Sequence, residues 1–129
     1  MAGNDERRAV PDERHSGAQK VFFICFTDPV DVSPEEMRPY LDEHKAWLAG
    51  VERSGTLFLG GPLLDDDFRF SGSGMWIIRA SSIREARQVM DADPFHSRGL
   101  RAYRVVPWQV NEGSLSIQAT LSTGTLSLG

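Results

Sequence analysis

The sequence predicts an α+β fold in which two helices pack on one face of an antiparallel sheet. Apolar segments typical of strands alternate with two amphipathic segments, in the order strand, helix, strand, strand, helix, strand. Each amphipathic segment begins with a serine that is followed three residues later by a glutamate, the pattern of a capped helix start. This βαββαβ order is that of the ferredoxin-like arrangement, so we expect one such domain over residues 20–110.

The first half of this domain is predicted as one strand and one interrupted helix. The segment VFFICFT at 21–27 is apolar and rich in β-forming residues, which suits a central strand buried on both faces. The helix is expected to begin at Ser33, with Pro34 in the first helical position. Pro39 removes a backbone hydrogen bond, so we expect a short first turn that kinks or restarts there. Gly55 is expected to end the helix.

The second half is predicted as three strands and one helix. In order, we expect a strand over 56–64, a polar loop over 65–74, a strand over 75–80, a helix over 82–90 and a strand over 100–110. The residue before a proline is disfavoured in helices, so Asp93-Pro94 should break the second helix. Pro107 marks the last strand as an edge or bulged strand.

The two ends of the chain lie outside this pattern. Residues 1–19 are polar and aperiodic, and we expect a disordered leader there. Residues 111–129 alternate apolar and small polar residues, which predicts a β extension added to the sheet or exchanged with a partner; a flexible tail is the alternative. An apolar sheet face without helices also needs a cover, so we expect a homodimer or a higher homo-oligomer.

Composition excludes several classes of function. The chain has 129 residues, 40% of them hydrophobic and 25% charged, as in ordinary globular domains. Its net charge of −4 and its scattered arginines argue against nucleic acid as a partner. No apolar run is long enough for a signal or a membrane span, so we expect no membrane contact and a cytoplasmic location.

Most isolated reactive residues have a structural explanation. Cys25 lies within an apolar strand and is expected to be a buried, inert thiol. Three adjacent aspartates at 65–67 suit a solvated loop better than a metal site, and we expect neither metal nor cofactor. His96 is expected at a surface turn, and a place in the same pocket as Asp93 is the alternative.

His44 and Asp93 are the two polar residues on the inward stripes of the two predicted helices. If the carboxylate reaches the imidazole, it fixes the ring tautomer, and the pair becomes a general acid and base. The alternative is a core histidine bonded to backbone, with Asp93 only capping the turn before Pro94.

Several short motifs, taken together, resemble the YCII-related (YciI-like) family. The family has a helix histidine, a glycine-proline ending the second strand, an aspartate-proline-aromatic run followed by glycine, and a strand ending in proline-aromatic. The corresponding residues here are His44, Gly61-Pro62, Asp93-Pro94-Phe95, Gly99 and Pro107-Trp108, within residues 20–110.

This resemblance implies a dimeric α+β barrel whose active site contains the pair of His44 and Asp93. One relative of this type removes chloride from a hydroxylated aromatic ring. We expect substrate contacts from the residues of the other motifs and from the aromatic side chains near them, namely Gly61, Pro62, Pro94, Phe95 and Trp108.

Three functions remain open from the sequence. The first is a cofactor-independent enzyme of the isomerase, lyase or dehydrochlorinase type, acting on a small cyclic or aromatic compound through His44 and Asp93. The second is a non-catalytic module for ligand binding or oligomerisation, and the third is a cofactor-free oxygenase. A cavity closed by aromatic side chains favours the binding module, whereas an open cleft with both polar groups in it favours an enzyme.

Overall fold

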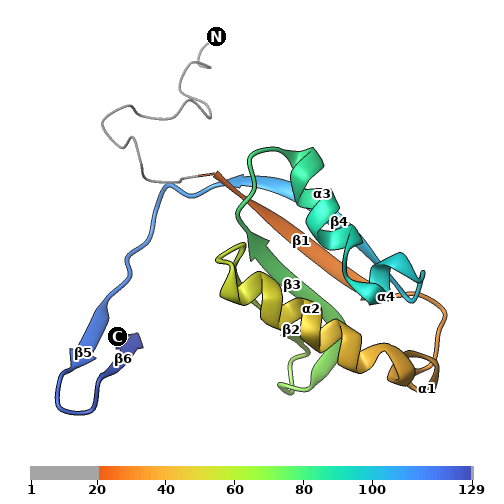
Figure 1. The fold of residues 1–129 in the computed structure, drawn as a ribbon, viewed down its shortest axis with the longest axis horizontal. Coiled ribbons are helices and arrows are strands. Elements are labelled where there is room, and N and C mark those ends of the chain that lie inside the picture. The colour runs from red at the N-terminus through yellow and green to blue at the C-terminus, as the bar shows by residue number, and fades with distance from the viewer. Residues whose placement is uncertain (1–20, 129) are drawn as a thin grey trace, which may run out of the picture.

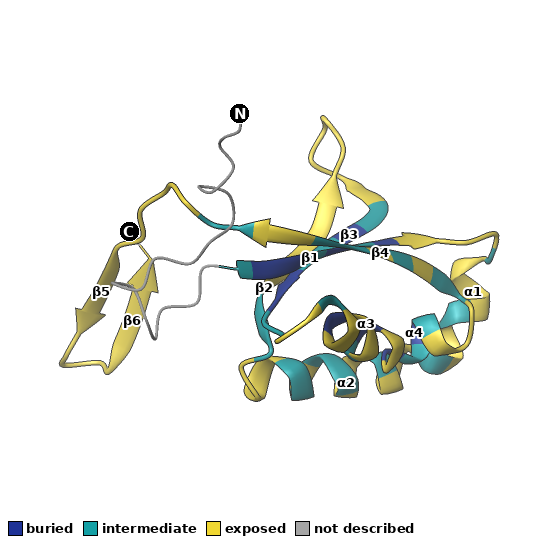
Figure 2. Cartoon of the chain, turned by 90° about the horizontal axis from the view of Figure 1, so that it is seen from above, coloured by how far each residue is buried: buried dark blue, intermediate teal, exposed yellow. Residues whose placement is uncertain are grey.

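The structure is a computed structural model that describes residues 21–128. The predicted leader at 1–19 lies outside the described residues. The main sheet contains four antiparallel strands in the order β2-β3-β1-β4: β1 (Val21–Pro29), β2 (Leu57–Leu64), β3 (Phe70–Ile78) and β4 (Arg101–Gln109). The helices are α1 (Pro34–Met37), α2 (Leu41–Arg53), α3 (Ile83–Asp91) and α4 (Pro94–Ser97). The α+β, ferredoxin-like order is therefore confirmed, with all helices on one face of the sheet (Figures 1 and 2).

The first helical region has the predicted start and the predicted interruption. The Ser33 hydroxyl accepts a hydrogen bond from the Glu36 backbone N–H, and the Glu36 carboxylate accepts one from the Ser33 N–H. Pro39 lies in a 3-10 turn at Arg38–Tyr40 that separates α1 from α2. Gly55, with φ of 81°, follows the end of α2 in the left-handed conformation that favours glycine.

The region after α3 differs from the prediction. The helix begins after Ser82 as expected, but it ends at Asp91, so Asp93 is not part of its inward stripe. Asp93 instead caps a separate four-residue helix, α4, whose first residue is Pro94. A proline in that position starts a new helix as readily as it breaks the preceding one.

The loop between β2 and β3 is shorter than predicted, because β3 begins at Phe70 and not at Met75. The glycine- and serine-rich first half of β3 pairs with β2, with Pro62 opposite Gly74 and Leu64 opposite Phe70. Strand propensity is low in this segment, so the partner strand and not the local sequence determines its conformation.

The buried core lies beneath α3, on the helix side of the sheet. It comprises Phe23, Cys25, Ile78, Ala86 and Met90. Helix α2, by contrast, contains no fully buried residue. Its inward residues are only half-buried, because a cavity separates part of this helix from the sheet.

The opposite face of the sheet carries no helix and is largely apolar. Successive side chains of a strand point to opposite faces, so Phe22, Ile24 and Phe26 of β1 lie on this face. Their partners on the neighbouring strands include Met75, Ile77, Val106 and Trp108. Arg104, also on this face, lies over the ring of Phe26.

The C-terminal segment contains the predicted extra strands, but they do not extend the main sheet. β5 (Ile117–Thr120) and β6 (Thr125–Leu128) pair with each other as a separate two-stranded sheet. The hairpin stands away from the domain and all its residues are exposed (Figures 1 and 2). Exchange of this segment with a partner stays a prediction.

Every helix within residues 21–128 is too short or too polar to cross a lipid bilayer.

Candidate active site

A partly open cavity of about 430 Å³ lies between α2 and the sheet. Apolar side chains form most of its wall, among them Leu48 of α2, Leu57 of β2, and Phe70 and Trp76 of β3. The polar side chains on the wall are Thr27, His44, Glu52, Asp93 and Arg101. A small, mostly apolar cavity with a few polar groups is typical of a site for an organic ligand.

His44 and Asp93 meet at this cavity. His44 Nδ1 lies 2.9 Å from Asp93 Oδ1, and the two side chains are 16% and 2% exposed. The imidazole also stacks on the ring of Phe95, with centroids 4.3 Å apart and planes inclined by 12°. Its Nε2 has no hydrogen-bond partner among residues 21–128. The ring is therefore held in one orientation, with one nitrogen available to a ligand.

Asp93 performs both roles that the sequence left open. Its Oδ1 accepts a hydrogen bond from the backbone N–H of Phe95, 3.0 Å away, as the N-cap of α4. The same oxygen accepts a hydrogen bond from His44. The cap fixes the carboxylate, so the imidazole meets an acceptor that is already in place.

His96 is not the surface residue that the sequence predicted, because its side chain is only 2% exposed. Its Nδ1 lies 2.8 Å from the carbonyl oxygen of Met90, and its Nε2 lies 2.8 Å from the hydroxyl of Thr27. Burial lowers the pKa of His96, which favours the neutral ring. In that form Nδ1 donates to the carbonyl and Nε2 accepts from the hydroxyl.

Arg101, at the start of β4, was not predicted from the sequence as a site residue. Its Nε donates to the Thr27 hydroxyl over 3.0 Å, and its Nη2 donates to the carbonyl oxygens of Thr27 and Gly72 over 2.9 and 2.8 Å. Burial lowers its pKa, while Asp28 and Asp93 act in the opposite direction. The network places a partly buried guanidinium on the cavity wall.

A family model matches most of the described chain. The YCII-related domain matches residues 21–109, which include His44, Asp93 and every strand of the main sheet. The chain belongs to the YCII-related domain family. The match ends before β5, so the C-terminal hairpin lies outside the family domain.

No curated protein matches the chain. One similar solved structure is 5-chloro-2-hydroxyhydroquinone dehydrochlorinase from Burkholderia phenoliruptrix AC1100, in complex with 2,5-dihydroxybenzoquinone. It is 26% identical, with a TM-score of 0.48, and the similarity covers 71% of this chain and 95% of that chain.

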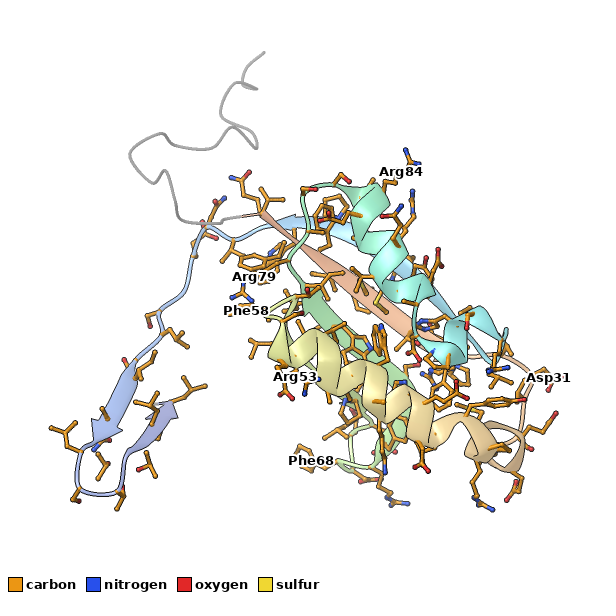
Figure 3. All side chains as sticks on the ribbon, in the orientation of Figure 1. Asp31, Arg53, Phe58, Phe68, Arg79 and Arg84 are labelled. Carbon is orange, nitrogen blue, oxygen red and sulfur yellow. The ribbon has the colours of Figure 1, made fainter. Side chains whose placement is uncertain are left out.

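The residues predicted to contact a substrate separate into two groups within this YCII-related domain. Gly61, Pro62 and Phe95 line the cavity, whereas Pro94 and Trp108 do not. Trp108 lies opposite Phe22 on the helix-free face, with ring centroids 6.4 Å apart. The same face carries Phe58, beneath the guanidinium of Arg79 (Figure 3).

Cys25 and the aspartates at 65–67 have surroundings typical of residues with a structural role. Cys25 is fully buried, and burial raises its pKa to about 12. In the β2–β3 loop, the Asp65 carboxylate accepts hydrogen bonds from the backbone N–H groups of Asp67 and Arg69. Within residues 21–128 no group of three or more histidine, cysteine or acidic side chains is arranged to hold a metal ion.

Proposed function

We propose that this YCII-related protein is a cofactor-independent enzyme that moves a proton on a small cyclic or aromatic compound. The supporting observation is the His44 and Asp93 pair, 2.9 Å apart on the wall of a largely apolar cavity. Asp93 orients the imidazole and stabilises its protonated form. His44 Nε2 is the general base, and later the general acid.

The proposed chemistry begins at a C–H group next to a ring carbonyl. Nε2 of His44 accepts that proton, and the electron pair of the C–H bond moves to the carbonyl oxygen, which gives an enolate. Return of the proton to a different carbon gives an isomer. Loss of a halide ion from the neighbouring carbon completes an elimination, and the proton then passes from His44 to water.

The shape of the cavity supports an enzyme over a binding module. The aromatic side chains do not close it, because Trp108 lies on the other face of the sheet and Phe95 stacks against His44. The cavity is partly open, with His44 and Asp93 both on its wall. A matched imidazole and carboxylate in such a position favour catalysis.

The proposal includes a homodimer formed through the helix-free face. Apolar side chains of all four strands lie on this face, and Leu59 there is 54% exposed. An apolar sheet face of this kind is stabilised by association with a second copy. Sedimentation of the purified protein tests this part, and a monomer at micromolar concentration contradicts it.

The experiment for the activity uses solvent deuterium. The protein is incubated in D2O with enolisable cyclic ketones, unsaturated lactones and cyclic ketones that carry chlorine on the carbon next to the enolisable one, and ¹H NMR and chloride release report exchange, isomerisation and elimination. In His44→Asn the rate for any active compound should fall by about 100-fold or more, the usual range for general acid–base catalysis. Asparagine can still donate to Asp93, so the carboxylate keeps a partner. Full activity in His44→Asn contradicts the proposal, and His15→Asn is the control for loss of a histidine.

A further inference from the structure

The cavity contains a positive charge that the proposed proton transfer does not use. Arg101 lies on the same wall as Asp93 and is partly buried. Its Nε and Nη2 make three hydrogen bonds, all to uncharged oxygens of Thr27 and Gly72. Its Nη1 donates to no acceptor within residues 21–128, and the guanidinium forms no ion pair there.

A guanidinium in this position is not explained by bridging two strands alone. Removing a charge from water is costly, and hydrogen bonds to neutral oxygens compensate for it only in part. The acidic side chains whose charges act on Arg101 are Asp28 and Asp93, and Asp93 is already bonded to His44. Because the hydrogen bonds hold Nε and Nη2, the side chain is fixed with Nη1 unused. A negatively charged oxygen in the cavity supplies the missing partner.

The cavity wall also suits a flat ring. Trp76 gives the wall an aromatic surface beside the apolar side chains, while its indole Nε1 is itself buried and makes no hydrogen bond within residues 21–128.

We propose that Arg101 binds a ring oxyanion of the ligand, so that the site selects phenolate-like compounds over neutral rings of the same shape. The inference rests on the proposed function for the identity of the cavity as a substrate site. In that reaction Arg101 holds the negative oxygen of the enolate that forms when His44 takes the proton.

The test measures binding and not turnover. The probes are 4-nitrophenolate, at a pH where it is ionised, and 4-nitroanisole, in which a methyl group blocks the same oxygen. Calorimetric titration of the full-length protein should give tighter binding of the phenolate. In Arg101→Gln the affinity for the phenolate should fall about tenfold or more, the effect of one charge-assisted hydrogen bond, and the affinity for the anisole should stay the same.

The matched control is Arg84→Gln, which removes the same charge from α3. Arg84 is exposed and does not line the cavity, so this variant should keep the preference for the phenolate. Arg101→Lys keeps the charge and should retain part of the preference. It serves as the second variant if Arg101→Gln does not fold.

Each result decides the inference. The inference is overturned if the protein binds the two probes equally or binds neither of them. It is also overturned if Arg101→Gln loses affinity for both probes equally, because a purely structural arginine does not distinguish ligand charge. Phenolate binding that depends on Arg101, without turnover of any compound in the deuterium assay, supports the anion site and counts against the enzyme.

Discussion

His96 Nε2 lies 2.8 Å from the hydroxyl of Thr27, although 69 residues separate the two in the sequence. The second nitrogen of the ring bonds to the Met90 carbonyl, so a neutral imidazole links the end of α3 to β1. Arg101 donates to the same Thr27 hydroxyl. The orientation of the cavity wall therefore depends on a histidine that does not itself line the cavity.

The neutral state of His96 predicts a pH dependence of stability. Burial lowers its pKa in the folded protein below the ordinary value of 6.5, so the unfolded chain binds more protons near and below that pH. The free energy of unfolding should be fully retained above pH 6.5 and should fall as the pH decreases below it. Urea unfolding between pH 7.5 and pH 5 measures this change. The free energy of unfolding should depend less on pH in His96→Gln. An unchanged pH dependence in that variant contradicts the assignment of a neutral His96.

Two substitutions of Asp93 separate its capping role from its charge. Asparagine is also a good N-cap, so Asp93→Asn should keep α4. The same substitution removes the negative charge that lies beside His44. Asp93→Ala loses the cap as well, and should be less stable than Asp93→Asn by about 1 kcal/mol. Urea unfolding measures the difference, and the deuterium assay should show a loss of activity in both variants. Equal stability of the two variants argues against the cap.

Two adjacent glycines of β2 should respond differently to a methyl group. A Cβ on Gly60 would lie 2.9 Å from Cε3 of Trp76, so the indole must shift and the cavity must change shape. A Cβ on Gly61 would meet nothing within 4 Å. Gly60→Ala should lose about 1–3 kcal/mol of stability, as overpacking does, and should change the tryptophan fluorescence. Gly61→Ala is the control and should be as stable as the parent; equal losses in both contradict the contact.

Removal of the C-terminal hairpin should not weaken the domain. β5 and β6 pair only with each other, and apolar residues of the hairpin, such as Leu121 in the turn and Leu126 in β6, are 90% and 72% exposed. A chain that ends at Val110 should therefore keep its free energy of unfolding within about 0.5 kcal/mol, the range of surface changes. Urea unfolding of the two chains at equal concentration measures this. A larger loss would show that the hairpin packs against the domain.

Local patterns predicted the order of elements, the capped helix starts and the interruption at Pro39. These patterns failed where contacts with segments distant in the sequence determine the local structure. The first half of β3 is glycine- and serine-rich and becomes a strand only through its pairing with β2. The C-terminal strands were expected to join the main sheet or to be exchanged with a partner. They do not join the main sheet; alternation predicts a strand and not its neighbour.

The contact between His44 and Asp93 was predictable because residue type and position agreed. His44 on an inward helix stripe and the family motif around Asp93 led to a pair that the structure brings together. Arg101 was missed because a charged residue at the start of a strand is usually exposed, and nothing in the local sequence indicates that this one is partly buried. His96 was assigned to the surface because a histidine after a proline turn has no local sign of burial.

The buried core lies mainly under α3 and the cavity mainly under α2, and the two meet at Leu57 and Trp76, which line the cavity and also pack against the core. Side chains of α2 that face the cavity, such as Leu48, contribute less to the packing that holds the domain together, since α2 has no fully buried residue. Substitutions at positions such as Leu48 can therefore alter the shape of the cavity at a modest cost in folding. This separation gives the scaffold capacity to diverge in ligand preference, and makes α2 the element of choice for engineering a new specificity.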